Sequence, residues 1–346
     1  MTSFASDYLE GAHPRILERL FNTNMEQTAG YGCDAHCENA ARLIQQACNR
    51  HDADVHFLVG GTQTNATVIS SVLRPHQGVV CASTGHINVH ETGAIEHSGH
   101  KVLALPTDNG LLTATEVEEV FHSHYTDPNI EHTVQPAMVY LSFPSELGTL
   151  YSKQQLTAIA DVCHRYHAPL FIDGARLGYG LASPACDLTL ADIAHLADIF
   201  YIGGTKQGAL FGEALVICNS NYKTDFRYHI KQNGALLAKG RLLGIQFETL
   251  FEDGLYMSLS KHAIDAAMQL RSVLLSEPCK SRYSMPIDGL TNQLFVEMSN
   301  YDYERLSKNF SFEIWQRNQT TCMVRICTSW ATTQQAVEQL AKALSL

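Results

Sequence analysis

Between about residues 55 and 218, short apolar runs alternate with longer amphipathic stretches. The runs are rich in Val, Ile and Phe, and each is bounded by Gly, Ser or Pro, which is the pattern of buried strands. Seven strands are predicted, at VHFLV (55–59), VVCAS (79–83), KVLALP (101–106), AMVYLSF (137–143), APLFID (168–173), IFYIGG (199–204) and EALVIC (213–218). Helical patterns such as SKQQLTAIADVCHRYH (152–167) fill the gaps. This alternation predicts an α/β domain with a mostly parallel sheet covered on both faces, and active residues at the carboxyl ends of its strands.

After about residue 240 the pattern changes. A long helical segment contains FETLFEDGLYMSLSKHAIDAAMQLRSVL, and strands follow at LFVEM, FEIWQR and MVRICTS, before a final helix near 332–344. This order of elements predicts a small C-terminal α+β domain. We therefore expect an N-terminal arm (1–30), a large domain (31–245) and a small domain (246–346).

Composition and charge narrow the class of partner. The 346 residues carry a formal net charge of −11, whereas nucleic acids and anionic membranes bind clustered Lys and Arg, so neither is expected as a partner. The first 25 residues hold several charged side chains and no signal-peptide core, and no later apolar run is long enough to span a membrane. Ten cysteines form no C-x-x-C pair and are expected to be reduced. These features predict a cytoplasmic protein that acts on a small molecule.

Two residues at strand ends carry the candidate chemistry. FIDGARLG places Asp173 at the end of one strand, and IGGTKQGALFG places Lys206 after the next, in a run with almost no other charge. Alone, each is weak evidence, because a strand-end Asp is often a helix cap and a loop lysine is often a surface residue. Together they match the needs of pyridoxal 5'-phosphate (PLP), with Lys206 forming the Schiff base and Asp173 keeping the pyridine nitrogen protonated. Thr205, beside the lysine, is a candidate donor to the phosphate.

Two further segments fit the same cofactor. GGTQTN (60–65) directly follows a predicted strand, and its glycines, hydroxyl and backbone N–H groups at a helix start form an anion site. His86 follows the strand VVCAS, and its imidazole ring would lie on the pyridine face with its nitrogens available for proton transfer. A metal site is the alternative, because four histidines and Glu91 lie between residues 86 and 100. No H-E-x-x-H pattern is present, however, so no metal site is predicted.

The ordered set SDY (6–8), YGCD (31–34), GGTQTN, GHINVHETGAIE, IDGARLG, GGTKQG and VRICTS resembles the threonine aldolase and β-eliminating lyase family of PLP enzymes of fold type I. The resemblance covers most of the chain. It implies a large domain with a mostly parallel seven-stranded sheet between helices and a small C-terminal α+β domain. It also implies a low-specificity L-threonine aldolase-like activity, which cleaves β-hydroxy-α-amino acids of the threonine or allo-threonine type to glycine and an aldehyde. Elimination of a β leaving group from an amino acid stays open as the alternative.

The resemblance implies a role for each matching residue. Lys206 corresponds to the Schiff-base lysine, Asp173 to the partner of the pyridinium and His86 to the stacked imidazole. The phosphate loop corresponds to Gly61, Thr62 and Gln63. The substrate carboxylate would be bound by Ser6, Arg176 and Arg325, since a guanidinium fork suits a planar anion.

The resemblance also implies a homodimer or homotetramer with active sites at the subunit interface. Arg241, or Lys239 in its place, would reach the neighbour's phosphate, and Tyr31 would lie at the interface. One departure concerns the loop LSFPSELGTLYS (141–152), which lacks the Thr-His pair that handles the β-hydroxyl in many aldolases of this family. Glu146, His86 or His90, acting through water, are the candidate bases, so the substrate is not fixed by the resemblance.

Overall fold

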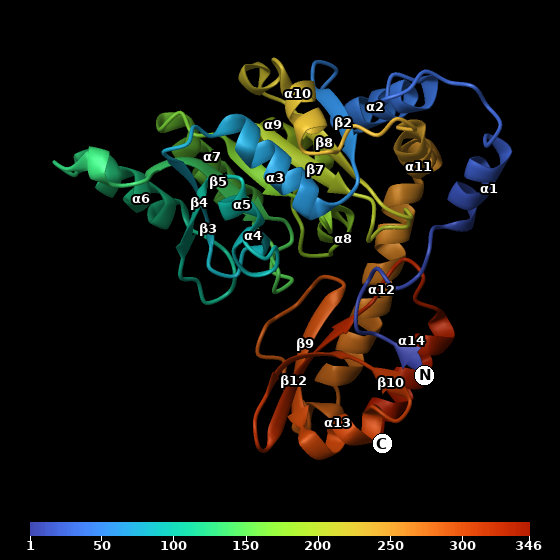
Figure 1. Ribbon diagram of the computed structural model, residues 1–346. Coiled ribbons are helices and arrows are strands. Elements are labelled where there is room, and N and C mark those ends of the chain that lie inside the picture. The colour runs from blue at the N-terminus through green and yellow to red at the C-terminus, as the bar shows by residue number, and fades with distance from the viewer.

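The computed structural model describes all 346 residues, and its larger part is a seven-stranded sheet between two layers of helices (Figure 1). The strand order is β2 (Asp54–Leu58), β8 (Glu213–Ile217), β7 (Ile199–Gly203), β6 (Leu170–Asp173), β5 (Gln135–Ser142), β3 (Gln77–Ala82) and β4 (Lys101–Leu105). β8 runs antiparallel to both of its neighbours, and every other pair is parallel. The seven predicted strands and the predicted fold class are confirmed.

Helices cover both faces of this sheet because its side chains alternate between two apolar cores. Along β6, for example, Leu170 and Ile172 enter one core while Phe171 enters the other. The first core is covered by α2 (Ala35–Ala47), α6 (Ala114–Thr126), α7 (Lys153–Arg165), α9 (Leu190–Leu196) and α11 (Arg241–Phe251). The second is covered by α3 (Gly61–Val72), α4 (His86–Val89), α5 (Ala94–His97) and α10 (Phe226–Gln232).

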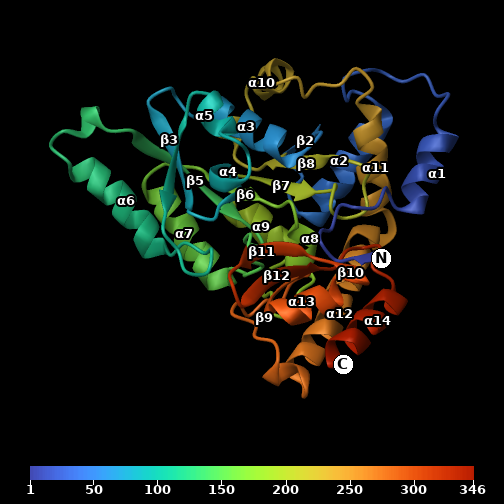
Figure 2. The same ribbon diagram turned by 60° about the horizontal axis from the view of Figure 1, so that its bottom comes forward.

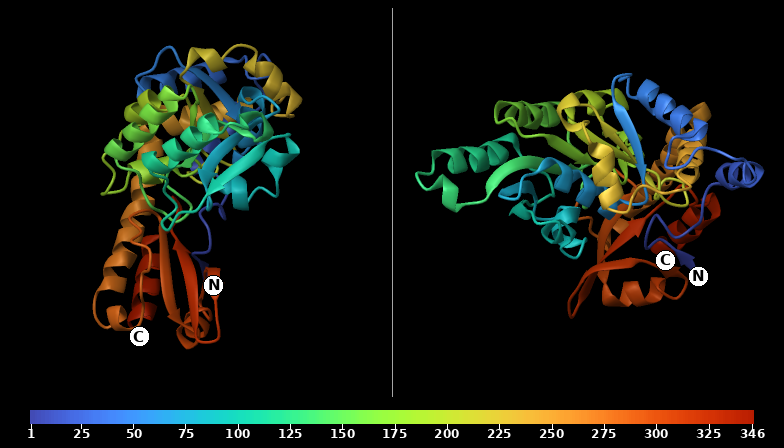
Figure 3. Two further views of the ribbon diagram at one scale, coloured as in Figure 1. Left: turned by 90° about the vertical axis from the view of Figure 1, so that its left-hand side faces the viewer. Right: turned by 45° about the horizontal axis from the view of Figure 1, so that its top comes forward.

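The smaller part of the chain is built on an antiparallel sheet in the order β11 (Glu313–Arg317), β12 (Thr321–Cys327), β9 (Gln293–Ser299). It packs against α12 (Leu255–Leu275), α13 (Asn300–Leu306) and α14 (Gln334–Ser345) around a separate apolar core. Figure 3 shows α12 running down from the larger part along one side of this sheet. The predicted C-terminal α+β unit is confirmed by this arrangement.

The N-terminal residues also belong to this smaller part. β1 (Thr2–Ser3) pairs in parallel with β10 (Phe310–Ser311), and Phe4 is buried in the smaller core. Both chain ends therefore lie at the smaller part (Figures 1 and 2). α1 (Pro14–Asn22) then returns the chain to the larger part, where it packs against α11.

The helical segment expected around residues 247–274 is two helices, α11 and α12, rather than one. Asp253 and Gly254 between them have φ values of 54° and 68°, in the left-handed region that ends a helix. Side chains from α11 and from the start of α12 pack in the first core of the larger part. Side chains from the second half of α12 pack in the core of the smaller part. The boundary at residue 245 stays a prediction, although the change of core occurs within α12. No helix has both the length and the apolar composition that crossing a bilayer requires.

Candidate active site

A cavity of about 320 Å³ lies at the carboxyl ends of β5, β6 and β7, where they face the first turn of α3. Seven of the residues expected in the site line it, namely Gly61, Thr62, His86, Asp173, Arg176, Thr205 and Lys206. A larger hollow of about 860 Å³ along β4 and α6 contains none of them. The smaller cavity is therefore the candidate site.

Asp173 is the last residue of β6 and is almost fully buried at the floor of this cavity. Four donors surround its carboxylate: Tyr140 Oη at 2.5 Å and Asn65 Nδ2 at 3.1 Å on Oδ2, and Tyr201 Oη at 2.5 Å and the Ala175 N–H at 3.0 Å on Oδ1. Burial alone would raise the pKa of Asp173, but the charge of His86 and the two tyrosine hydroxyls lower it below its ordinary value. Asp173 is thus held as an anion inside the protein.

His86 begins α4 and is held by a buried carboxylate. Its Nδ1 lies 2.8 Å from Oε1 of Glu91, and the same oxygen accepts a 2.8 Å hydrogen bond from Asn65 Nδ2. Burial would lower the pKa of His86, but Glu91 and Asp173 raise it. The ring is therefore fixed in orientation, and Glu91 favours its protonated form.

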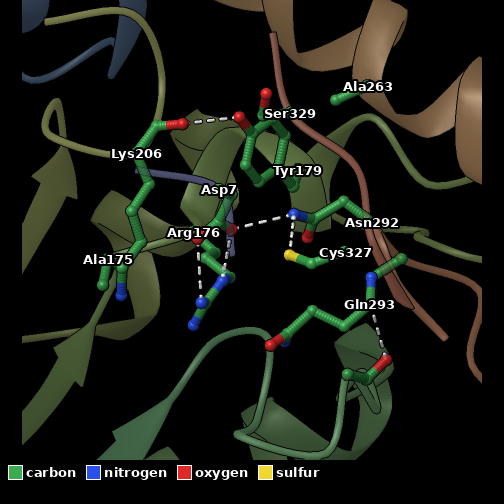
Figure 4. Close-up of polar contacts among 12 residues, drawn as sticks. Asp7, Ala175, Arg176, Tyr179, Lys206, Ala263, Asn292, Gln293, Cys327 and Ser329 are labelled. Carbon is green, nitrogen blue, oxygen red and sulfur yellow. Dashed lines mark hydrogen bonds and ion pairs between the residues drawn. The ribbon is translucent and has the colours of Figure 1, made fainter. Parts of the chain in front are cut away.

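Lys206 lies on the loop between β7 and β8. Its carbonyl oxygen accepts a 2.5 Å hydrogen bond from Tyr179 Oη of α8 (Leu177–Leu181), which anchors the backbone, whereas its Nζ makes no hydrogen bond or ion pair within the chain (Figure 4). Burial, and then the charge of Arg176, lower the pKa of Lys206. A neutral amine is a nucleophile, so this environment favours covalent chemistry at Nζ.

The first turn of α3 is suited to bind an anion. Gly60 precedes this twelve-residue helix and provides no capping side chain, so the first N–H groups of the helix face the cavity beside Gly61 and Thr62. Gln63, in contrast, uses its side chain to bridge Val59 N and the Asn233 carbonyl oxygen, both at 3.2 Å, and does not line the cavity. The side chain of Gln63 is therefore not available for the phosphate contact that the resemblance implies.

The three residues expected to bind the substrate carboxylate lie around one stretch of the N-terminal arm. Arg176 donates from Nε and Nη2 to Asp7, at 2.6 and 3.0 Å, and Asn292 donates to the same carboxylate at 2.9 Å (Figure 4). Burial would raise the pKa of Asp7, but Arg176 lowers it to about 2. Asp7 therefore fixes one edge of the Arg176 guanidinium and leaves the other edge for a ligand.

Arg325 approaches the same stretch from β12. It donates to the Ala5 carbonyl oxygen at 3.3 Å and to Gln293 Oε1 at 2.9 Å, and it pairs with Glu313. Three buried donors here have no partner in the chain: Arg325 Nε, Ser6 Oγ and Gln293 Nε2. Unpartnered buried donors are costly unless a ligand satisfies them, which fits an anion site.

Of the three candidate bases, two line the cavity. Glu146 Oε1 accepts hydrogen bonds from the backbone N–H of His86 at 2.8 Å and from the Ser142 hydroxyl at 2.5 Å. Burial raises the pKa of Glu146. His86 is the second, and His90 lies outside, with its ring 6.4 Å from that of Trp315. The rings of His86 and His90 are 5.6 Å apart, but no group of three or more His, Cys, Asp or Glu is arranged to hold a metal ion.

The residues expected at a subunit interface lie away from this cavity. Arg241 donates to the carbonyl oxygens of Thr23 and Asn24, at 2.7 and 3.0 Å. Tyr31 and Lys239 are exposed. None of the three lines the cavity of its own chain.

Sequence reasoning missed several residues that organise the site. Tyr140 and Tyr201 bind Asp173, and both point into the same core as Phe171, two residues before Asp173. Strand alternation could have shown this common face. Asp7 lies within the SDY motif, but only Ser6 of that motif was predicted to bind the substrate. No pattern in the sequence relates Asp7 to Arg176. Glu213, at the start of β8, was also missed.

Comparisons with known proteins find one family and several related enzymes. A family model described as β-eliminating lyase matches residues 3–282. The low specificity L-threonine aldolase of Pseudomonas sp. (strain NCIMB 10558) is 30% identical over 343 residues, covering 98% of this chain and 95% of that protein. The enzyme of the same name from Pseudomonas aeruginosa is 27% identical over 346 residues, covering 99% and 97%.

Among solved structures, the threonine aldolase of Leishmania major superposes with a TM-score of 0.95 at 45% identity, covering 99% of this chain and 98% of that one. The architecture is that of PLP enzymes of fold type I. Because the family model matches residues 3–282 and a relative is 30% identical over almost the whole length, the chain belongs to the β-eliminating lyase family.

Proposed function

We propose that this chain is a PLP-dependent aldolase that cleaves β-hydroxy-α-amino acids, of the threonine or allo-threonine type, to glycine and an aldehyde. One observation carries the proposal: half-buried Lys206, whose Nζ is unpaired, shares a cavity with the Asp173 anion and the open first turn of α3. The near-complete superposition on a threonine aldolase supports it.

The donor set of the cavity fits PLP. Lys206 would bond to its aldehyde carbon, Asp173 would hold its pyridine nitrogen, and His86 would cover the ring. Its phosphate would lie against Gly61, Thr62, the backbone N–H of Gln63 and Thr205, with Arg241 supplied by a neighbouring subunit. When bound, PLP supplies the electron sink for the bond that breaks at the substrate Cα.

The remaining residues would bind and orient the substrate. Arg176, Arg325 and Ser6 would hold its carboxylate, with Asp7 fixing the guanidinium of Arg176. For the β-hydroxyl proton we favour Glu146, because both of its hydrogen bonds reach Oε1 and Oε2 stays available. His86 is the weaker base, since Glu91 favours its protonated form.

Product analysis tests this function. The purified protein, incubated with threonine, allo-threonine and phenylserine, should release glycine and the matching aldehyde. Pyruvate and ammonia from serine or cysteine, without glycine from threonine, would instead identify the alternative, β-elimination. Threoninamide serves as a control, because it lacks the carboxylate and should be cleaved at least about 10-fold less efficiently if the arginines bind that group.

We also propose a homodimer or homotetramer whose active sites lie at the subunit interface. Arg241 lies outside the cavity of its own chain, and the surface near it exposes large apolar side chains, with Phe21 82% and Met25 87% exposed. Such surfaces favour association. A cytoplasmic location stays a prediction that cell fractionation would check.

Subunit complementation tests the shared site. Lys206→Ala and Arg241→Ala should each be poorly active alone, whereas co-expression should recover about a quarter of the wild-type activity, since random pairing leaves one intact site in half of the dimers. Light scattering should give a mass of two or four subunits. A monomer, or no recovery on co-expression, would contradict the proposal.

A further inference from the structure

Glu213 is a buried carboxyl group that none of the roles above uses. It is the first residue of β8, pairs across the sheet with Leu58 of β2 and Gly203 of β7, and lines the cavity. α3 begins three residues after Leu58, and Lys206 lies three residues after Gly203. Glu213 therefore lies between the anion-binding first turn of α3 and the lysine loop.

The hydrogen bonds of Glu213 control the direction of a neighbouring hydroxyl. Oε2 accepts the Gly204 N–H at 3.1 Å, and Oε1 lies 3.0 Å from Thr205 Oγ1, which also accepts the Gly212 N–H at 3.0 Å. An ionised carboxylate only accepts hydrogen bonds, so it would take the single hydroxyl hydrogen of Thr205. In that state Thr205 has no hydrogen left for a phosphate.

A proton on Glu213 reverses this bond. The acid would then donate to Thr205 Oγ1, whose two lone pairs would accept from Glu213 and from the Gly212 N–H. The Thr205 hydrogen would become free to point into the cavity. Burial raises the pKa of Glu213 to about 8, although the charge of Lys206 opposes this, so the neutral acid is present at neutral pH.

We propose that Glu213 is a positioning residue that, as a neutral acid, turns the Thr205 hydroxyl toward the cofactor phosphate and couples phosphate binding to uptake of one proton. The inference rests on the proposed function, because it takes PLP as the ligand. An ionised carboxyl group beside an anion site would repel the phosphate, whereas the neutral acid would not.

The ionisable groups that act on Glu213 come from four elements: Lys206 of the β7–β8 loop, Asp173 of β6, Tyr201 of β7 and Tyr256 of α12. Lys206 is the one cation among them. Burial raises the pKa of both tyrosines well above the ordinary value, so they stay neutral in the working range. A phosphate placed beside this set would add negative charge and raise the pKa of Glu213 further.

The test compares the affinities of the full-length apoprotein for PLP and for pyridoxal, which lacks the phosphate. If only the neutral acid supports phosphate binding, the PLP-to-pyridoxal affinity ratio should fall about tenfold between about pH 7 and about pH 9. Glu213→Gln should give a ratio independent of pH, because the amide donates to Thr205 at every pH. Thr205→Ala should bind PLP more weakly at about pH 7, and its ratio should fall less between about pH 7 and about pH 9, because only the repulsion by ionised Glu213 remains. Both ligands bond to Lys206, so its titration changes both affinities alike and cancels in the ratio.

A second measurement needs no variant. At about pH 8, calorimetry in buffers of different ionisation enthalpy should show PLP binding taking up about half a proton more than pyridoxal binding. Equal proton uptake, or the wild-type pH dependence retained in Glu213→Gln, would overturn the inference and leave the proposed function intact. A wild-type protein that binds no PLP would contradict both.

Discussion

Replacing Lys206 with alanine should lower kcat by more than about 1,000-fold, because the amine that bonds to the cofactor is lost. Lys206 is the one lysine that lines the cavity, and its Nζ is unpaired and has a lowered pKa. The wild-type protein should show an absorbance band near the visible edge that disappears on borohydride treatment. The variant should lack that band.

Lys261→Ala is the matched control, since this exposed lysine pairs only with Asp265 one helical turn away. It should keep both the band and the activity. Near-normal kcat in Lys206→Ala would contradict the assignment of the lysine. Loss of the band together with normal cleavage of threonine would contradict PLP dependence altogether.

Asp173→Asn should lower kcat by about 100-fold to 10,000-fold while the protein still binds PLP. The asparagine keeps the shape of the side chain and one accepting oxygen, but its amide nitrogen cannot accept the hydrogen bond that a tyrosine donates to the second oxygen. It also removes the charge that would keep the pyridine nitrogen protonated. The pKa of His86 should also fall, because Asp173 helps to raise it. Steady-state kinetics, PLP titration and the NMR titration of His86 measure the three effects.

Asp198→Asn provides a matched control for this variant. Asp198 is also buried beside a strand, where it accepts the Leu170 N–H at 2.8 Å and the Asn219 amide at 2.7 Å, but it does not line the cavity. The control should lose stability without a loss of kcat. If both variants lost kcat equally, the effect of Asp173→Asn would be structural rather than electrostatic.

The sequence predicted the sheet well because its strands are buried on both faces. Continuous apolar runs such as IFYIG and EALVI need no tertiary information to be recognised, and both are strands with every residue buried. Lys206 and Asp173 were placed in one site for a related reason, since the ends of β6 and β7 meet at the same edge of the sheet.

The partners of these residues depend on contacts between distant segments. Asp7 and Arg176 are 169 positions apart, and no local pattern relates them. The side chain of Gln63, assigned to the phosphate, instead bridges Val59 and Asn233, because a loop far along the chain offers it a carbonyl oxygen. The break at Asp253 and Gly254 was missed since apolar spacing continues across it. Pattern alone therefore located the reactive groups but not the groups that hold them.

The parallel pairing of β1 with β10 has a consequence for synthesis of the protein. The carbonyl oxygen of Phe4 accepts the Cys327 N–H at 2.8 Å, and Arg325 reaches Ala5, so residues from both ends of the chain complete the region expected to bind the substrate carboxylate. Contacts of such large sequence separation form late, after the intervening segments have folded. A ribosome-bound chain can build the seven-stranded sheet and the lysine loop before β12 emerges. The region expected to bind the substrate carboxylate is then completed only after β12 has reached the N-terminal arm.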